Sequence, residues 1–156
     1  MKRLALTLGA SALAGALIIH KLRRRRAGSE DVVRAYFDAW SEGDVDSMRD
    51  LVSDDYQAHV HVLDATEERS ADELISVVGG QAKAFSDIEY ELHDVISHNG
   101  SVAVRATMRA QHEETGREGE MDGIAILRLE DGRIAEEWSS WDYLGLASQL
   151  GLAKSK

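Results

Sequence analysis

Residues 131–151 read DGRIAEEWSSWDYLGLASQLG, a tight turn followed by a strand and the start of a closing helix. A strand alternates its faces at every residue, so Trp138 and Asp142 are expected to share the side that encloses a cavity. A carboxylate in an indole-lined pocket is a candidate general base, because burial opposes its ionisation. The alternative interpretation makes Trp138 a core residue and Asp142 the cap of the next turn.

Three further strands are predicted upstream of this stretch. They cover residues 88–96, 102–112 and 119–129, and the turns between them contain Asn99-Gly100 and Gly116. Together with residues 134–141 they form a meander of four antiparallel strands. The second half of the chain therefore predicts one curved sheet.

The first half of the chain carries helix signals. Ser29 precedes two acidic residues and is typical of a helix start, Gly43 ends that helix, and Asp44 begins a short second one. Ser70 and Glu73 have the capping-box spacing of a third helix. Between the second and third helices, residues 56–62 alternate as a strand. Helices followed by an antiparallel sheet indicate an α+β domain with a ligand cavity at its open end.

The charge of the chain is unevenly distributed. Of its 18 basic residues, 7 lie in residues 1–27, which contain no acid; the rest of the chain has 11 basic and 28 acidic residues, a net charge of −17. Such a surface repels nucleic acid. It suits a salt-rich cytoplasm, although acidic domains are also common in mesophiles. The absence of cysteine excludes disulfides and thiolate chemistry.

The first 27 residues form a hydrophobic and basic leader. Its uncharged run, residues 4–19, would span roughly 24 Å as a helix, a little less than the hydrocarbon core of about 30 Å. Four arginines follow at 23–26, so an anchored chain would keep its domain cytoplasmic. The alternative is a disordered basic tail. We predict a leader at 1–27, a domain at 28–152 and a tail at 153–156.

Five segments carry a family resemblance that extends over about residues 29–151. The order of elements resembles the SnoaL-like polyketide cyclases, or ester cyclases, of the nuclear transport factor two and ketosteroid isomerase superfamily. The resemblance implies a cone-shaped barrel of curved, mainly antiparallel sheet wrapped over three N-terminal helices. The segments are YFDAW at 36–40 with Gly43-Asp44, SDDYQAH at 53–59, AFSDI at 84–88, VAVR at 102–105 leading to His112, and DGRIAEEW at 131–138 leading to Asp142 and QLG at 149–151.

The resemblance also implies a chemistry. Asp142 matches the aspartate that acts as general acid/base in the intramolecular aldol cyclisation, or the isomerisation, of a small hydrophobic carbonyl compound; no metal or organic cofactor takes part. His59 or His112 would donate hydrogen bonds to the enolate. The residues expected to bind the substrate are Tyr36, Trp40, Met121 and Trp138.

Several alternatives remain beside this interpretation. The strand pattern places His59 on the surface, whereas the resemblance places it in the pocket; His112 has inward parity and is also compatible with a plain core residue. Epoxide hydrolysis or hydration would need a second carboxylate near Asp142, and Glu136 lies roughly 20 Å along the strand. A non-catalytic binding module, or a homodimer formed through the open sheet face, is equally compatible with this fold. No metal-ligand motif is present: His59 and His61 lack a third ligand at diagnostic spacing.

Overall fold

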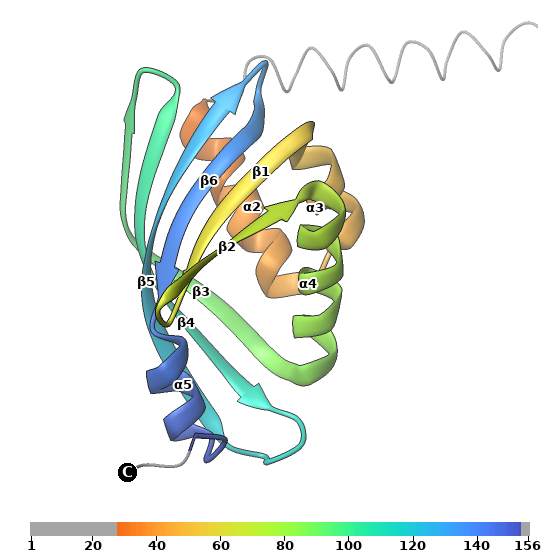
Figure 1. The fold of residues 1–156 in the computed structure, drawn as a ribbon. Coiled ribbons are helices and arrows are strands. Elements are labelled where there is room, and N and C mark those ends of the chain that lie inside the picture. Colours follow the sequence, from red (N-terminus) through yellow and green to blue (C-terminus); the bar gives the residue numbers. More distant parts are fainter. Residues whose placement is uncertain (1–27, 154–156) are drawn as a thin grey trace, which may run out of the picture.

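The computed structural model describes residues 28–153 (Figure 1). The predicted leader at 1–27, with its anchor at 4–19, lies outside the described residues. The elements are α2 (Ser29–Glu42), α3 (Val45–Leu51), β1 (Val52–Val62), β2 (Ala65–Ser70), α4 (Ala71–Ala84), β3 (Phe85–His98), β4 (Ser101–His112), β5 (Glu118–Glu130), β6 (Arg133–Trp141) and α5 (Tyr143–Gln149).

The six strands form one curved sheet in the order β2-β1-β6-β5-β4-β3. Neighbouring strands are antiparallel except β1 and β6, which are parallel. Helices α2, α3 and α4 lie against the concave side, and α5 extends from the end of β6 (Figure 1). This confirms the predicted α+β fold, with an open sheet that has β2 and β3 at its edges.

Local signals set the helix boundaries. Gly43 ends α2 with a φ of 64°, a left-handed conformation that glycine adopts without a Cβ penalty. The Asp44 carboxylate accepts a hydrogen bond from the Ser47 amide at 3.0 Å, and the Ser70–Glu73 capping box opens α4. The cap of α2 is Gly28, one residue before the predicted Ser29.

Two hairpins are closed by the residue pairs that such turns favour. Asn99 and Gly100 have φ values of 48° and 79°, and Asp131 and Gly132 have values of 50° and 75°. Two consecutive positive φ angles match the twist of the flanking strands and suit Asn-Gly and Asp-Gly pairs. The predicted meander from β3 to β6 is therefore confirmed, with each strand slightly longer than expected.

Strand β2 was absent from the sequence prediction. Its sequence, ATEERS, is mostly exposed and has little of the β-branched and aromatic character typical of strands. It forms because it pairs with β1 in a register that runs from Gln57 and Ser70 to Val62 and Ala65. This edge strand carries Arg69 into the lining of the cavity described below.

The main core lies between the concave side of the sheet and the helices. Val33, Phe37, Met48 and Leu127 are among its buried residues. A smaller core forms where α5 packs on β4 and β5, and its buried members are Met108, Ala110, Met121, Leu146 and Leu150. None of the helices within residues 28–153 is long and apolar enough to cross a membrane.

Candidate functional site

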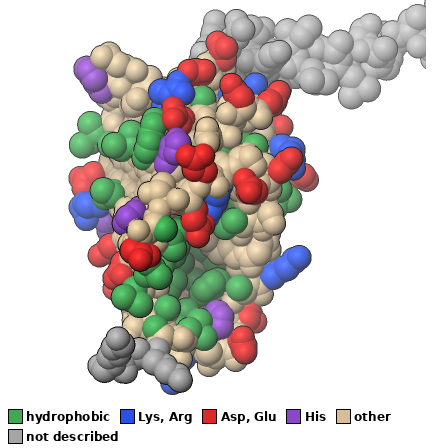
Figure 2. Space-filling model, viewed as in Figure 1, with side chains coloured by type: hydrophobic (Ala, Val, Ile, Leu, Met, Phe, Trp, Pro, Cys, Tyr) green, Lys and Arg blue, Asp and Glu red, His purple; other side chains and the backbone are tan. Residues whose placement is uncertain are grey.

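The concave side of the sheet encloses a cavity of about 130 Å³. Its wall is unusually aromatic, since seven of the nine aromatic residues of the chain line it. Hydrophobic side chains gather between α4 and α5 on the face seen in Figure 2. The seven aromatic residues that line the cavity are Tyr36, Phe37, Trp40, Tyr56, Tyr90, Trp141 and Tyr143.

One buried carboxylate, Glu137 of β6, lies in this aromatic wall. It is 7% exposed. The hydroxyl of Tyr36, from α2, donates to Glu137 Oε2 at 2.6 Å, and the hydroxyl of Tyr56, from β1, donates to the same oxygen at 2.9 Å. Two elements, α2 and β1, thus each supply a donor to one acid of β6, and hydrogen bonds to an ionised acceptor are stronger than those between neutral groups.

The two phenols stay protonated at neutral pH. Burial raises the pKa of Tyr36 well above its ordinary value, and the adjacent charge of Glu137 raises it further. The pKa of Tyr56 is raised by the same two causes in the same order. Both hydroxyls are therefore donors, and they hold the Glu137 carboxylate in one orientation.

Hydrogen-bond donors from three further elements surround the cavity. Arg69 of β2 donates to Glu67 at 2.8 Å, and its charge acts on Tyr143 of α5. Burial raises the pKa of the Tyr143 phenol, while the nearby Arg69 opposes that rise. Gln81 of α4 uses its Oε1 to accept a hydrogen bond from Tyr90 at 3.4 Å, and its Nε2 is the donor of the same amide. The wall thus combines one carboxylate with several donors.

Three of the four residues expected to bind a substrate lie in this wall: Tyr36, Trp40 and Met121. The fourth, Trp138, is 41% exposed on the outer face of the sheet. There it stacks on His59, with ring centroids 5.4 Å apart and planes 18° apart. The expected placement of Trp138 on the enclosed side is therefore wrong, and His59 follows its strand pattern to the outer face.

Asp142 follows β6 and is exposed. Its Oδ1 accepts a hydrogen bond from the Gly145 amide at 2.8 Å, which makes Asp142 the N-cap of α5. This is the capping interpretation left open by the sequence. The role of Asp142 in proton transfer stays a prediction.

His112 is buried, as its inward parity predicted. Its ring lies 5.2 Å from that of Phe85, and its Nδ1 lies 3.1 Å from the Thr115 hydroxyl. It is outside the set of residues that line the aromatic cavity. The structure therefore brings Tyr36, Trp40 and Met121 together and places Asp142, His59 and His112 elsewhere.

Glu137 was missed because simple alternation along β6 assigns its residues to the wrong faces. Ile134 and Trp138 have the same parity, yet Ile134 is fully buried and Trp138 is exposed. The pairing of β5 with β6 shifts register between Arg128 and Leu129. After this shift the odd-numbered residues of β6, Glu137 among them, face the helices in place of the even-numbered ones. Glu137 and Trp141 lie on the same face of β6, four residues apart. This pairing of a carboxylate with an indole was the sequence signal that could have identified Glu137.

Residues 30–150 match the family model described as SnoaL-like polyketide cyclase. The chain belongs to this family. A comparison with curated protein sequences finds no match.

Solved structures resemble this SnoaL-like chain throughout its described domain. IdmH of Streptomyces antibioticus, a candidate polyketide cyclase, is 25% identical, with a TM-score of 0.71 over 80% of this chain and 99% of its own. AclR of Streptomyces galilaeus, a candidate hydroxylase, is 22% identical, with a TM-score of 0.71 over 81% and 87%. An LEH-like epoxide hydrolase of M. tuberculosis is 15% identical, with a TM-score of 0.64 over 78% and 88%. The last two show the shared fold alone.

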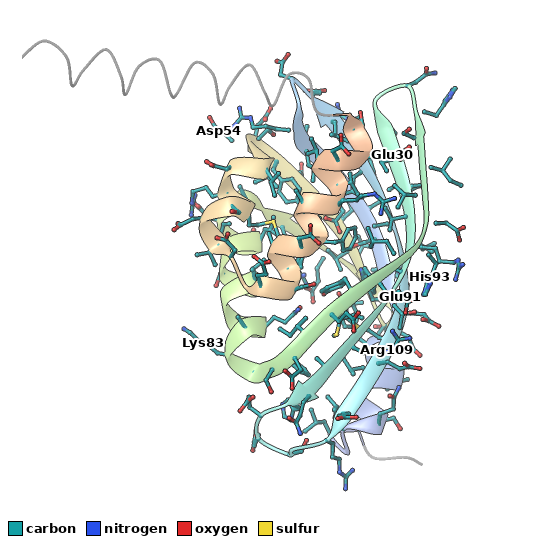
Figure 3. The ribbon with its side chains drawn as sticks, turned by 180° about the vertical axis from the view of Figure 1, so that it is seen from behind. Glu30, Asp54, Lys83, Glu91, His93 and Arg109 are labelled. Atoms are coloured by element: carbon teal, nitrogen blue, oxygen red, sulfur yellow. The ribbon has the colours of Figure 1, made fainter. Side chains whose placement is uncertain are left out.

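The outer face of this SnoaL-like domain carries a separate polar network. Glu91, His93 and Arg109 project from β3 and β4 on the side away from the helices (Figure 3). Arg109 donates to Glu91 at 2.6 Å and to Glu120 at 3.0 Å. These ion pairs link β4 to its two neighbours, β3 and β5.

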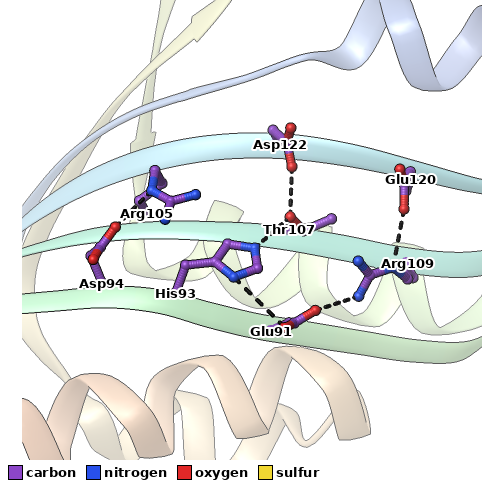
Figure 4. Close-up of polar contacts among 8 residues, drawn as sticks. All are labelled: Glu91, His93, Asp94, Arg105, Thr107, Arg109, Glu120 and Asp122. Carbon is purple, nitrogen blue, oxygen red and sulfur yellow. Dashed lines mark hydrogen bonds and ion pairs between the residues drawn. The ribbon is translucent and has the colours of Figure 1, made fainter.

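The centre of the outer network is a hydroxyl held by two partners. Thr107 donates to Asp122 Oδ1 at 2.6 Å, and His93 Nε2 lies 2.8 Å from the same hydroxyl (Figure 4). Residues 28–153 contain no group of three His, Cys, Asp or Glu side chains that could hold a metal ion. Cross-strand pairs of this kind stabilise a sheet face.

Proposed function

We propose that this chain is an acid/base enzyme for a small carbonyl compound, with Glu137 as the group that accepts and returns the proton. The observation that carries the proposal is the buried carboxylate held by two phenols inside an aromatic cavity. A general base must be positioned before the substrate arrives, and a dry site strengthens its electrostatic interactions.

The reaction begins with a proton on the carbon next to a carbonyl. That proton moves to Glu137, and the electron pair of the broken C–H bond is delocalised onto the carbonyl oxygen as an enolate. In an isomerisation, Glu137 returns the proton to another carbon. In an aldol cyclisation, the carbanion attacks a second carbonyl of the same molecule, and Glu137 protonates the new alkoxide. One residue thus serves as base and then as acid.

Tyr36 and Tyr56 would orient this base. Both donate to Oε2 of Glu137, so proton transfer is assigned to its other oxygen, Oε1. Arg69 and Tyr143, which also line the cavity, would stabilise the negative charge that develops on a substrate oxygen. These assignments differ from the prediction that the family resemblance made for Asp142, which stays untested.

The test is hydrogen exchange between solvent and a panel of single-ring ketones in heavy water, followed by nuclear magnetic resonance. Glu137→Gln is expected to lower the enzyme-dependent exchange rate by about 10²–10⁴-fold, the usual contribution of a general base. Glu136→Gln is the matched control, since its carboxylate lies on the outer face beside His59. Both variants must show native circular dichroism.

Asp142→Asn distinguishes the two candidate bases. Asparagine also caps helices, so the fold is preserved. If exchange falls with Asp142→Asn and persists with Glu137→Gln, the assignment of Glu137 is wrong. If the wild-type protein binds the ketones without exchange, the chain is a binding module of the same family.

We also propose that two copies associate through the outer face. Ile124, Ile126 and Trp138 are 60%, 49% and 41% exposed there, and the register places Ile126 opposite Trp138. An apolar patch on a face with charges of both signs suits a self-complementary two-fold contact. Light scattering should give a dimer for the wild-type chain and a monomer for Ile126→Asp. A wild-type monomer at micromolar concentration would reject this proposal.

The predicted leader leads to a third proposal, that residues 4–19 attach the chain to a membrane and leave the domain cytoplasmic. Its support is the uncharged run followed by four arginines. Flotation with anionic lipid vesicles should recover the full chain at the lipid layer. Recovery of the full chain in the unbound fraction would contradict it.

A further inference from the structure

We infer that Gln81 holds the carbonyl oxygen of the ligand, and that the ligand is a compact, planar carbonyl compound about the size of one ring. The catalytic part of this inference rests on the proposed function, whereas the binding part does not. It is drawn from an unpaired donor, the donor and acceptor balance of the wall, and the size of the cavity.

The amide of Gln81 has its acceptor in use and its donor free. Gln81 Oε1 accepts a hydrogen bond from the Tyr90 hydroxyl at 3.4 Å. Burial raises the pKa of Tyr90, so this phenol stays protonated and remains a donor. Gln81 Nε2 is buried without a hydrogen-bond partner in the described part of the chain. A buried donor of this kind is costly unless an acceptor reaches it.

The wall of the cavity favours a ligand that accepts hydrogen bonds. Gln81, Arg69 and Tyr143 supply donors, and Glu137 is the one carboxylate among the described residues that line the cavity. An ammonium ion would bring additional donors to a wall that already has several. A carbonyl oxygen complements Gln81, while an acidic C–H group of the same molecule complements Glu137.

The volume of the cavity limits the size of this molecule. At about 130 Å³, it is slightly smaller than an engineered protein cavity of about 150 Å³ that binds benzene. The surrounding rings favour a flat partner: Tyr90 meets Trp141 edge to face at 5.7 Å and lies 6.3 Å from Trp40. A fused multi-ring polyketide exceeds this space.

The same contact would assist the reaction. When the proton leaves carbon for Glu137, negative charge grows on the carbonyl oxygen. A donor already placed at that oxygen forms a stronger hydrogen bond to the enolate than to the ketone, which lowers the barrier. Gln81 would therefore act on both affinity and rate.

The experiment compares two probes of the same ring size, 2-cyclohexen-1-one and cyclohexene, which differ in the carbonyl group. Binding is followed by ligand-observed nuclear magnetic resonance and by fluorescence of Trp40 and Trp141, which line the cavity. The wild-type protein is expected to prefer the enone by about tenfold, the contribution of one good hydrogen bond. Gln81→Leu should abolish this preference and leave cyclohexene binding equal or tighter.

Two controls make the result specific. Gln57→Leu removes an exposed glutamine that pairs with Glu68 and should keep the preference. Gln81→Met, an unbranched alternative, should reproduce the effect of Gln81→Leu and serves if the leucine variant is unstable. A preference that survives both Gln81 variants would overturn the role of Gln81. Tighter binding of a two-ring ketone than of the enone would overturn the size limit.

The two proposals fail separately. Glu137→Gln should retain the preference for the enone, because the donor at Gln81 is intact. Enone preference without hydrogen exchange in the wild-type protein would reject the proposed enzyme and keep the binding inference. Hydrogen exchange that is equal in wild type and Gln81→Leu would keep the enzyme and reject Gln81 as its carbonyl donor.

Discussion

Alkaline pH is expected to unfold this domain through its tyrosines. All four tyrosines of the chain line the cavity, and burial raises the pKa of each above its ordinary value. An unfolded tyrosine ionises near pH 10, whereas its buried counterpart stays protonated. Above pH 10 the unfolded state therefore binds fewer protons, and the free energy of unfolding falls as the pH rises. Below pH 10 these groups contribute their full stabilisation.

The magnitude follows from the number of buried phenols. One pH unit above 10, each tyrosine that stays protonated in the folded state lowers the free energy of unfolding by about 1.4 kcal/mol. Tyr36, Tyr56 and Tyr90 together give a loss of about 4 kcal/mol at pH 11. That is close to the whole stability of a marginal domain, which starts at about 5 kcal/mol.

The assay is urea unfolding followed by circular dichroism between pH 9 and pH 11, with tyrosinate absorbance recorded in parallel. Tyrosinate should appear together with the loss of structure. Tyr90→Phe removes one titrating phenol and should reduce the loss at pH 11 by about 1.4 kcal/mol. Tyrosinate absorbance that rises near pH 10 while the circular dichroism stays native would refute the reasoning.

Four substitutions test particular contacts by urea or thermal unfolding. Gly123→Ala would place a Cβ 2.1 Å from the Trp141 ring, so we expect a loss of ~1–3 kcal/mol and altered tryptophan fluorescence; unchanged values would contradict the close packing. Gly80→Ala, in the open middle of α4, should add ~0.5–1 kcal/mol, and a loss would show that the space is needed. Asp142→Ala should cost ~1 kcal/mol through the lost cap, whereas equal stability of the alanine and asparagine variants would argue against capping. Tyr36→Phe removes a donor to the buried carboxylate and should cost ~1.5–3 kcal/mol; a cost below that of Asp142→Ala would contradict a strong hydrogen bond from Tyr36 to Glu137.

The elements that were predicted correctly depend on interactions within a few residues. The end of α2 at Gly43, the Asp44 cap and the Ser70–Glu73 box each involve groups at most five positions apart. The Asn99-Gly100 and Asp131-Gly132 turns likewise depend on two backbone conformations. Such signals can be read directly from sequence, because the same residue types satisfy them in any fold.

The missed features depend on partners far away in the chain. Strand β2 has weak intrinsic preference and exists through its pairing with β1. Tyr36 and Tyr56 reach Glu137 across 101 and 81 residues of sequence. Neither the pairing nor the convergence follows from periodicity in one segment.

Local signals along the chain were enough to predict the α+β architecture, the order of helices and meander, and the resemblance that the family match confirms. Tertiary structure decided which carboxylate the cavity encloses. Period-two alternation defines two faces of β6 but does not say which one the helices cover, and a register shift near Ile134 moves the inward phase from Trp138 to Glu137. Helix α2 packs against that inward face and β1 pairs beside β6 in the sheet, which is why Glu137 meets two phenols while Asp142 remains at the surface as the cap of α5.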